Sequence, residues 1–196
     1  MDRSIRPLVI VASFAASLLV GLVIMLWALG GLRGVTAPAA IGGPFQLTDQ
    51  AGQAVTEQNL KGKPTLIFFG FTHCPDVCPT SLFEISEVLK AMGTDADRVN
   101  AWFVSVDPER DTAAAMKDYL SSFDPHLKGL SGDPQAVAKV ISAYRVYARK
   151  VPLKDGDYTM DHTALIYLMD RDGHFVAPFN LKRTPEEAAK DLKRYL

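Results

Sequence analysis

The sequence lacks the features that mark several large classes of protein. Among its 196 residues only two are cysteine and four are histidine, and the formal net charge is -1. Lysines and arginines are dispersed among acidic residues and form no basic block, so nothing in the chain favours nucleic-acid binding. No internal repeat and no low-complexity tract is present. The length indicates one domain plus an appendage.

Charge is absent from residues 7–32, and residues 8–29 are almost purely apolar. A run of about 20 apolar residues matches the hydrocarbon thickness of a bilayer. A cleaved signal peptide is the main alternative, but its apolar region normally has only about 7–15 residues; a buried helix is the other. We therefore predict a retained membrane anchor over residues 1–33. Arg3 and Arg6 precede the span and favour a cytoplasmic N-terminus.

Residues 34–44 are rich in glycine, alanine and proline and are predicted to form a linker to a domain over residues 45–196. The domain begins with a predicted hairpin and then alternates strands with helices. Strands are expected at 66–71, 101–106, 127–130, 163–169 and 174–179, and helices at 79–92, 112–122, 134–144 and 185–195. Residues 149–162 are polar and are expected to be irregular. The order predicts an α/β domain: a thioredoxin-like mixed sheet flanked by helices, with an N-terminal hairpin addition.

Cys74 and Cys78 directly follow the apolar strand at 66–71, where the chain turns into a helix. Pro79 suits the first turn of that helix because its missing N–H would be unpaired there. The free N–H groups and the dipole of a helix N-terminus stabilise an anion, so we expect the pKa values of both thiols to be lowered. Thiolate attacks disulfides and binds soft metals, which makes this turn the candidate site.

The C-x-x-x-C spacing leaves two kinds of chemistry open. Residues four apart on a helix face the same way, so Cys74 and Cys78 can close a disulfide or bind one metal ion. A bridge that closes so short a loop adds little stability, which argues against a purely structural disulfide. Thioredoxin-type exchangers use C-x-x-C, one residue shorter. Two sulfurs alone are a poor shell for most metals, so a metal site needs a third ligand.

His162 is the candidate third ligand. It precedes the buried strand at 163–169, at the end that faces the cysteine turn in a thioredoxin-like fold. A histidine that is hydrogen-bonded within the sheet is the alternative. His73 is expected to point away from the cysteines, and His126 and His174 are expected to be solvated.

Three segments in order, FGFTHCPDVCPTSL, SVDPERDT and YTMDHTALIYL, resemble the motifs of the Sco/SenC family. These are membrane-anchored copper proteins that assist assembly of the copper centre in cytochrome c oxidase. The resemblance covers about residues 44–196. It implies copper ligands at Cys74, Cys78 and His162, and aspartates of functional interest at Asp107, Asp111 and Asp161.

The three aspartates have simpler interpretations as well. Asp161 could orient His162 or take part in metal transfer, or it could be an ordinary loop carboxylate. Asp107 and Asp111 could shape the loop, with Asp111 as the N-cap of the helix at 112–122.

The resemblance implies a copper chaperone in the bacterial inner membrane, single-pass, with its domain facing the periplasm. Its partners would be a copper donor and the copper-bearing subunit of cytochrome c oxidase. Two thiolates and one imidazole are a soft set that suits Cu(I), with Cu(II) also open, whereas structural zinc prefers four ligands.

Two enzymatic alternatives use the same thiols. A thiol–disulfide reductase would keep the acceptor's cysteines reduced; it would form a Cys74–Cys78 disulfide, depend on a thiol reductant and have no need for His162. A peroxidase needs an activated cysteine, often beside a basic residue, and the lysine or arginine nearest in sequence to Cys74 is Lys63.

Overall fold

The computed structural model describes residues 5–31, 40–154 and 156–196, which belong to two compact units, Met1–Ala39 and Ala40–Leu196. In the first unit, helix α1 (Ile5–Gly31) contains a segment, Val9–Ala28, that is long and apolar enough to cross a membrane. A signal sequence near the N-terminus has the same properties. Residues 34–39 of the predicted linker lie outside the described residues, and residues 40–44 belong to the second unit.

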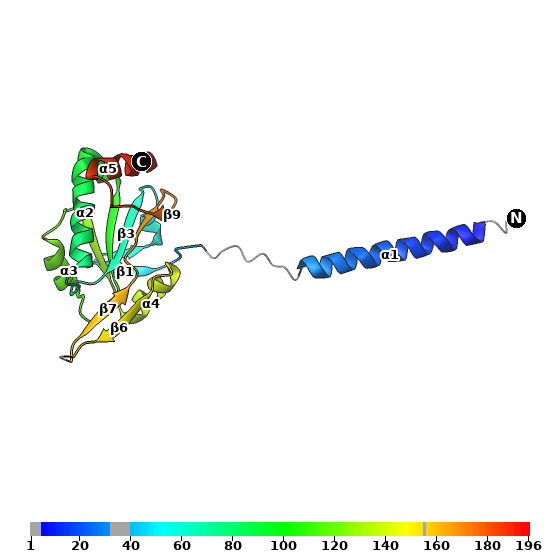
Figure 1. Cartoon of the computed structure of the whole chain (residues 1–196), viewed down its shortest axis with the longest axis horizontal. Coiled ribbons are helices and arrows are strands. Elements are labelled where there is room, and N and C mark those ends of the chain that lie inside the picture. Colours follow the sequence, from blue (N-terminus) through cyan, green and yellow to red (C-terminus); the bar gives the residue numbers. More distant parts are fainter. Residues whose placement is uncertain (1–4, 32–39, 155) are drawn as a thin grey trace. The chain divides into compact units, whose positions relative to one another are not determined.

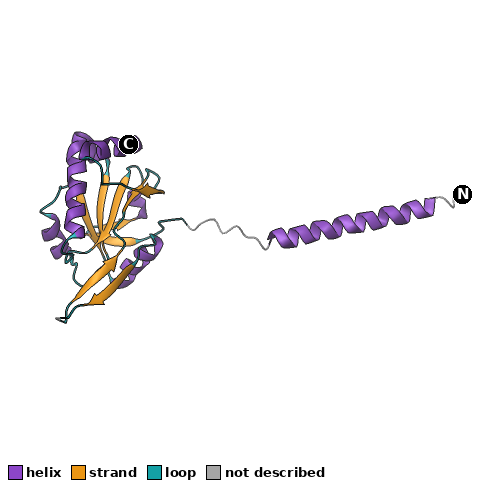
Figure 2. Cartoon of the chain, viewed as in Figure 1, coloured by secondary structure: helices purple, strands orange, loops and turns teal. Residues whose placement is uncertain are grey.

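The second unit is built on a mixed sheet with helices around it (Figures 1 and 2). Within the described residues the main sheet has seven strands in the order β2-β1-β5-β4-β3-β8-β9. Strands β3, β4 and β5 run parallel and the other neighbours are antiparallel, so the sheet is mixed, as the sequence predicted. The bounds are β1 Gln46–Asp49, β2 Ala54–Thr56, β3 Thr65–Gly70, β4 Asn100–Ser105, β5 Leu127–Ser131, β8 Ile166–Met169 and β9 Phe175–Pro178.

Four α-helices of the second unit fall where the sequence predicted them: α2 Val77–Met92, α3 Ala113–Leu120, α4 Pro134–Ala143 and α5 Pro185–Leu192. Helix α4 starts as expected, because the Asp133 side chain caps it and Pro134 occupies its first turn. Helix α5 ends at Leu192, before the predicted end, and a 3₁₀ turn, Lys193–Tyr195, completes the chain. Two further 3₁₀ turns are Glu57–Leu60 and Gly93–Arg98.

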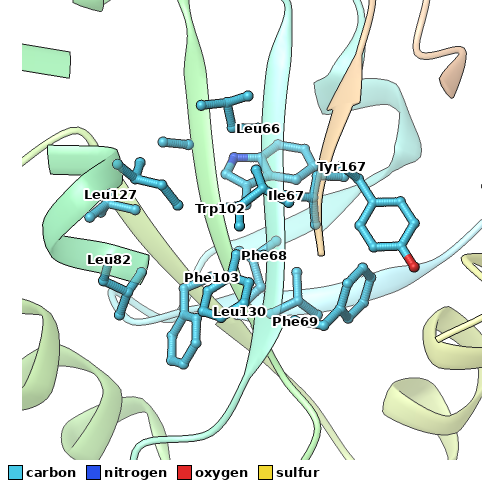
Figure 3. Packing of buried hydrophobic residues seen from close by; sticks show 14 of the residues in the cluster. Leu66, Ile67, Phe68, Phe69, Leu82, Trp102, Phe103, Leu127, Leu130 and Tyr167 are labelled. Atoms are coloured by element: carbon cyan, nitrogen blue, oxygen red, sulfur yellow. The ribbon is translucent and has the colours of Figure 1, made fainter. Parts of the chain in front are cut away.

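The apolar core lies on both faces of strand β3, which is buried along its whole length. On one face, Phe68 lies beside Phe103 of β4, and Tyr119 of α3 stacks on Phe103. On the opposite face, Phe69 packs against Tyr144 at the end of α4 and against Tyr167 of β8. Figure 3 shows Phe68 and Phe103 together, with Phe69 and Tyr167 to one side. Burial on both faces explains why β3 reads as a continuous apolar run.

The expectation that residues 149–162 are irregular is wrong. They form most of a second sheet, a hairpin of β6 (Ala148–Pro152) and β7 (Tyr158–His162), which Figure 1 shows projecting from the domain near α4. Neither strand has a fully buried residue. Most residues of the segment are polar, so it lacks the apolar run that predicts a buried strand.

His126 is not the fully solvated residue that we expected. Its Nδ1 lies 2.6 Å from a carboxylate oxygen of Asp124 and its Nε2 lies 3.1 Å from one of Asp97. The hydrogen bond with Asp124, supported by Asp97, raises the pKa of His126 above its ordinary value of 6.5. The pair of contacts joins the loop before β5 to the Gly93–Arg98 turn.

We predict a small, pH-dependent stabilisation from His126. Since its pKa is raised in the folded state, the stabilisation is complete below the unfolded pKa and is lost as the pH rises through the folded pKa. We expect about 0.5 kcal/mol, as for other partly exposed ion pairs. Urea unfolding of the wild type and of His126→Gln should differ at pH 5.5 and converge by pH 9. His174→Gln is the matched control, and equal curves for wild type and His126→Gln at pH 5.5 would contradict the prediction.

Candidate metal centre

The two cysteines lie in the turn between strand β3 and helix α2. The chain leaves the sheet at Gly70, turns through residues 71–76 and enters α2 at Val77, two residues before the predicted start. Cys78 therefore lies inside the first turn of the helix, whereas Cys74 precedes the helix. The backbone N–H of Cys78 donates to Sγ of Cys74 at 3.4 Å, which holds the two sulfurs together at the helix N-terminus.

His162 reaches this turn from the end of β7. Its Nε2 lies 3.6 Å from Sγ of Cys78, and the ligand atoms of Cys74, Cys78 and His162 all lie within 4.8 Å of one another. The other ring nitrogen, Nδ1, lies 3.0 Å from the carbonyl oxygen of Thr163. A hydrogen bond donated from Nδ1 leaves the lone pair of Nε2 facing the thiols, as a metal ligand requires. The structure thus brings together the three residues that the sequence selected.

Aromatic rings fix the plane of the imidazole. The ring of Phe71 meets the His162 ring edge to face, with centroids 5.8 Å apart and an interplanar angle of 89°. The Phe68 ring lies 6.4 Å away on the core side. These contacts leave His162 little freedom to turn, so the nitrogen that faces the sulfurs is positioned in advance.

The two thiols differ in exposure. Cys78 is buried and Cys74 is half-buried, and both are free in this structure. Burial raises the pKa of the Cys78 thiol, so the expectation of a lowered pKa is wrong for this residue. Loss of hydration at Cys78 outweighs the backbone hydrogen bond with Phe71, which lowers the pKa. The Cys74–Cys78 disulfide stays a prediction.

Asp111 is buried and holds the cysteine turn rather than capping a helix. Its carboxylate accepts the backbone N–H of Thr72 at 3.2 Å, the Thr72 hydroxyl at 2.6 Å and the Ser105 hydroxyl at 2.6 Å. The predicted N-cap role is wrong, because Thr112 caps α3 by accepting the N–H of Ala115. Burial raises the pKa of Asp111, while the donated hydrogen bonds oppose the rise.

Asp107 is also buried and contacts the β6–β7 hairpin. Its carboxylate accepts from Nε of Arg110 and, at 2.9 Å, from the hydroxyl of Tyr158 on β7. The two loop aspartates therefore reach the two halves of the site: Asp111 reaches the turn with the cysteines, and Asp107 reaches the hairpin with His162.

The other candidates lie outside the cluster. Asp161 is 57% exposed, and its carboxylate lies 3.9 Å from Arg149. To orient His162, Asp161 would have to accept a hydrogen bond from its Nδ1. That nitrogen instead lies 3.0 Å from the carbonyl oxygen of Thr163. A part for Asp161 in metal transfer stays a prediction. His174 is exposed, as expected; His73 is exposed as well and is not part of the Cys74, Cys78 and His162 group.

Sequence reasoning missed Gly70, Thr72, Arg110 and Tyr158. Thr72 and Asp111 are 39 positions apart, and Tyr158 and Asp107 are 51 apart, so no local pattern links them. Gly70 carried one signal, since glycine at a strand end often marks a close approach. A Cβ atom at this position would lie 2.8 Å from Sγ of Cys78.

The family model described as SCO1/SenC matches residues 33–196 of the chain. The chain belongs to the SCO1/SenC family. Protein SCO1 homolog 1, mitochondrial, of Arabidopsis thaliana is 46% identical over 165 residues, which are 80% of this chain and 48% of that protein. An SCO2-like protein of Rickettsia conorii is 38% identical over 155 residues, 78% of this chain and 76% of that protein. The chain thus spans about half the length of the Arabidopsis relative.

Solved SCO1/SenC structures share this fold. ScoI of Bradyrhizobium japonicum, solved with copper bound, is 84% identical with a TM-score of 0.79, and the match covers 80% of this chain and all of that one. Yeast Sco1, also solved with copper bound, is 37% identical with a TM-score of 0.70, and the match covers 80% of this chain and 91% of that one. The predicted fold class, a thioredoxin-like mixed sheet preceded by one apolar helix, is confirmed.

Proposed function

We propose that this chain is a copper-binding protein of cytochrome c oxidase assembly, and that Cys74, Cys78 and His162 hold the copper. One observation carries the proposal: the two sulfurs and one imidazole nitrogen lie within 4.8 Å of one another. Two thiolates and an imidazole are a soft donor set that favours Cu(I). The copper-bound structures of ScoI from Bradyrhizobium japonicum and of yeast Sco1 support the same metal.

Binding must remove protons from the thiols. Burial raises the pKa of Cys78, so this thiol is protonated before copper arrives and releases its proton as the copper–sulfur bond forms. Copper affinity should therefore rise with pH. With Nδ1 donating to the carbonyl oxygen of Thr163, the imidazole would offer the lone pair of Nε2 to the metal.

We further propose that the chain delivers its copper. Three ligands leave Cu(I) with a low coordination number, and half-buried Cys74 gives an acceptor's ligands a side from which to attack. The acceptor would be the copper-bearing subunit of cytochrome c oxidase, and a separate donor would supply the ion. Helix α1 would anchor the chain in the bacterial inner membrane with the domain in the periplasm, where a reductant must keep the thiols reduced.

Copper binding by His162→Ala tests the three-ligand site. The full chain in detergent micelles, reduced and free of oxygen, is titrated with Cu(I) in competition with a chromogenic chelator. We expect one copper per wild-type chain and an affinity roughly 100-fold lower for His162→Ala, about 2.7 kcal/mol. X-ray absorption should show sulfur and nitrogen neighbours in the wild type and sulfur alone in the variant.

His174→Ala is the matched control, because this histidine is 79% exposed and lies in the turn before β9. It should bind copper as the wild type does. Equal affinity for His162→Ala and the wild type would refute the three-ligand site, and a wild type that binds no copper would refute the copper function.

The different exposure of the two thiols supports a second candidate, a thiol–disulfide reductase. Half-buried Cys74 would attack an acceptor disulfide as thiolate, form a mixed disulfide and release one acceptor thiolate. Cys78 would then attack Cys74 Sγ, close the Cys74–Cys78 disulfide and release the second, so that two electrons pass to the acceptor. In Cys78→Ser the mixed disulfide should persist and be seen by mass spectrometry. Absence of any adduct with an oxidised acceptor peptide would argue against this role.

A further inference from the structure

The β6–β7 hairpin carries His162 but does not pair with the main sheet, so hydrogen bonds of that sheet do not set its position. Within the described residues its two strands pair only with each other. Near its base, the N–H of Thr163 donates to the carbonyl of Tyr147, and the N–H of Tyr147 donates to the Thr163 hydroxyl. Ala148 of β6 and Met160 of β7 pack against the apolar core, and polar contacts fix how the hairpin lies over the cysteine turn.

Arg110, in the loop between β4 and α3, makes that contact. Its guanidinium donates from Nε to the buried carboxylate of Asp107 and from Nη1 to the carbonyl oxygen of Tyr158 at 2.9 Å. Nη1 also lies 3.3 Å from the Asp157 carboxylate. The Arg110 side chain is only 16% exposed, so solvent screens these interactions weakly.

The same guanidinium lies over two aromatic rings. It is 3.7 Å from the centroid of the Tyr158 ring and 5.8 Å from that of Phe71. Phe71 in turn meets the imidazole of His162 edge to face. Arg110 therefore contacts the hairpin at Tyr158 and the ring that orients His162.

The Tyr158 side chain also joins the hairpin to the loop at 107–111. Its hydroxyl donates to Asp107 at 2.9 Å, and Lys150 of β6 lies 4.0 Å from its ring centroid. Lys150 also pairs with Glu109 at 2.8 Å, so both strands of the hairpin are joined to the loop at residues 107–111. We refer to Asp107, Arg110 and Tyr158 as the Arg110 cluster.

We propose that Arg110 is a positioning residue: through the Arg110 cluster it fastens the β6–β7 hairpin to the loop at 107–111 and so sets the distance between His162 and the two thiols. The same loop holds the cysteine turn through Asp111 and Thr72, so one segment aligns both halves of the ligand set. The inference rests on the proposed function for its consequence in copper binding, but the position of the hairpin can be tested without metal.

Arg110→Met removes the charge and the three hydrogen bonds to Asp107, Asp157 and Tyr158 while retaining a long apolar stem. Arg98→Met is the matched control, since Arg98 also pairs with the aspartate three residues before it, at 3.2 Å, but is 59% exposed and precedes β4 at the opposite end from the 107–111 loop. Tyr158→Phe removes only the hydroxyl that donates to Asp107. If Arg110→Met does not fold, Tyr158→Phe tests whether the Arg110 cluster positions the hairpin.

Two measurements use the metal-free full chain in detergent micelles. Hydrogen exchange followed by mass spectrometry should show roughly tenfold faster exchange in residues 148–162 of Arg110→Met, with β3 and β4 unchanged. Diethyl pyrocarbonate should modify His162 faster in the same variant. Tyr158→Phe should show smaller changes of the same kind, and Arg98→Met none.

Copper binding supplies a third readout. Loss of an outer partner of a metal site typically lowers affinity by roughly 10- to 100-fold, and we expect this for Arg110→Met, together with loss of the nitrogen neighbour in X-ray absorption. Arg110→Lys should recover part of the affinity. Wild-type rates of hairpin exchange and of His162 modification in both Arg110→Met and Tyr158→Phe would overturn the inference. A wild type that binds no copper would refute only the proposed function, because the metal-free rates still decide the role of Arg110.

Discussion

Replacing Asp111 with alanine is expected to lower the free energy of unfolding of the domain by about 4 kcal/mol, since hydrogen bonds to a buried charged group contribute about 1.5–3 kcal/mol each. The carboxylate accepts three donors, the N–H and hydroxyl of Thr72 and the hydroxyl of Ser105. Alanine accepts none of them and leaves a cavity beside the cysteine turn. Urea unfolding of the full chain in detergent micelles, followed by the fluorescence of buried Trp102, measures the loss.

Asp118→Ala is the control for this prediction, because Asp118 is an exposed residue of α3. Its stability should lie within about 0.5 kcal/mol of the wild type. Asp111→Asn retains an acceptor oxygen, so its free energy of unfolding should lie between those of Asp111→Ala and Asp118→Ala. If Asp111→Ala unfolds at the same urea concentration as the wild type, the buried carboxylate does not hold the turn.

Replacing Gly70 with alanine is expected to disturb both the fold and the copper site. The new Cβ would lie 2.5 Å from a ring carbon of Phe103 and 2.8 Å from Sγ of Cys78, and neither group can move freely because both are buried. Overpacking of this kind costs about 1–3 kcal/mol, and we expect about 3 kcal/mol here. Displacement of the Cys78 sulfur should also weaken Cu(I) binding by about tenfold or more.

The matched control is Gly43→Ala. A Cβ at Gly43 would meet the Cβ of Ala143 at 3.5 Å, an ordinary contact, so stability and copper affinity should stay close to the wild type. The two variants are compared by the same urea unfolding and Cu(I) competition. Unchanged copper affinity in Gly70→Ala would show that the sulfur of Cys78 can shift without harm to the site.

The ligand set was visible in the sequence because it depends on short motifs at the ends of apolar strands. Residues 66–71 are six successive apolar or small residues, which predicts a buried strand, and the structure has that strand at Thr65–Gly70. That strand fixes where Cys74 and Cys78 emerge. The third motif predicted His162 directly before a buried strand at 163–169; the structure instead has His162 at the end of β7, and the buried strand β8 begins at Ile166. The resemblance to SCO1/SenC proteins, carried by the same motifs, then supplied the metal.

The hairpin and the contacts of Asp107 and Asp111 could not be predicted, because they depend on residues far apart in the sequence. The β6–β7 strands are largely polar and only partly buried, and Arg110 and Tyr158 join them to partners far apart in the sequence. Asp111 looked like a helix cap because a carboxylate before a helix often is one. The Asp111 side chain instead points toward the hydroxyl groups of Thr72 and Ser105, which only the folded chain brings beside it.

The sequence by itself determined the α/β class, the apolar N-terminal span and the identity of the three candidate ligands. Each of these follows from local composition or from a short motif. Only the tertiary structure decided that Cys78 is buried with a raised pKa, that Asp107 and Asp111 face inward, and that Arg110 contacts both Asp107 and Tyr158 of the hairpin. Burial and buried hydrogen bonds arise where distant segments meet, so the neighbours of a residue along the chain do not specify them.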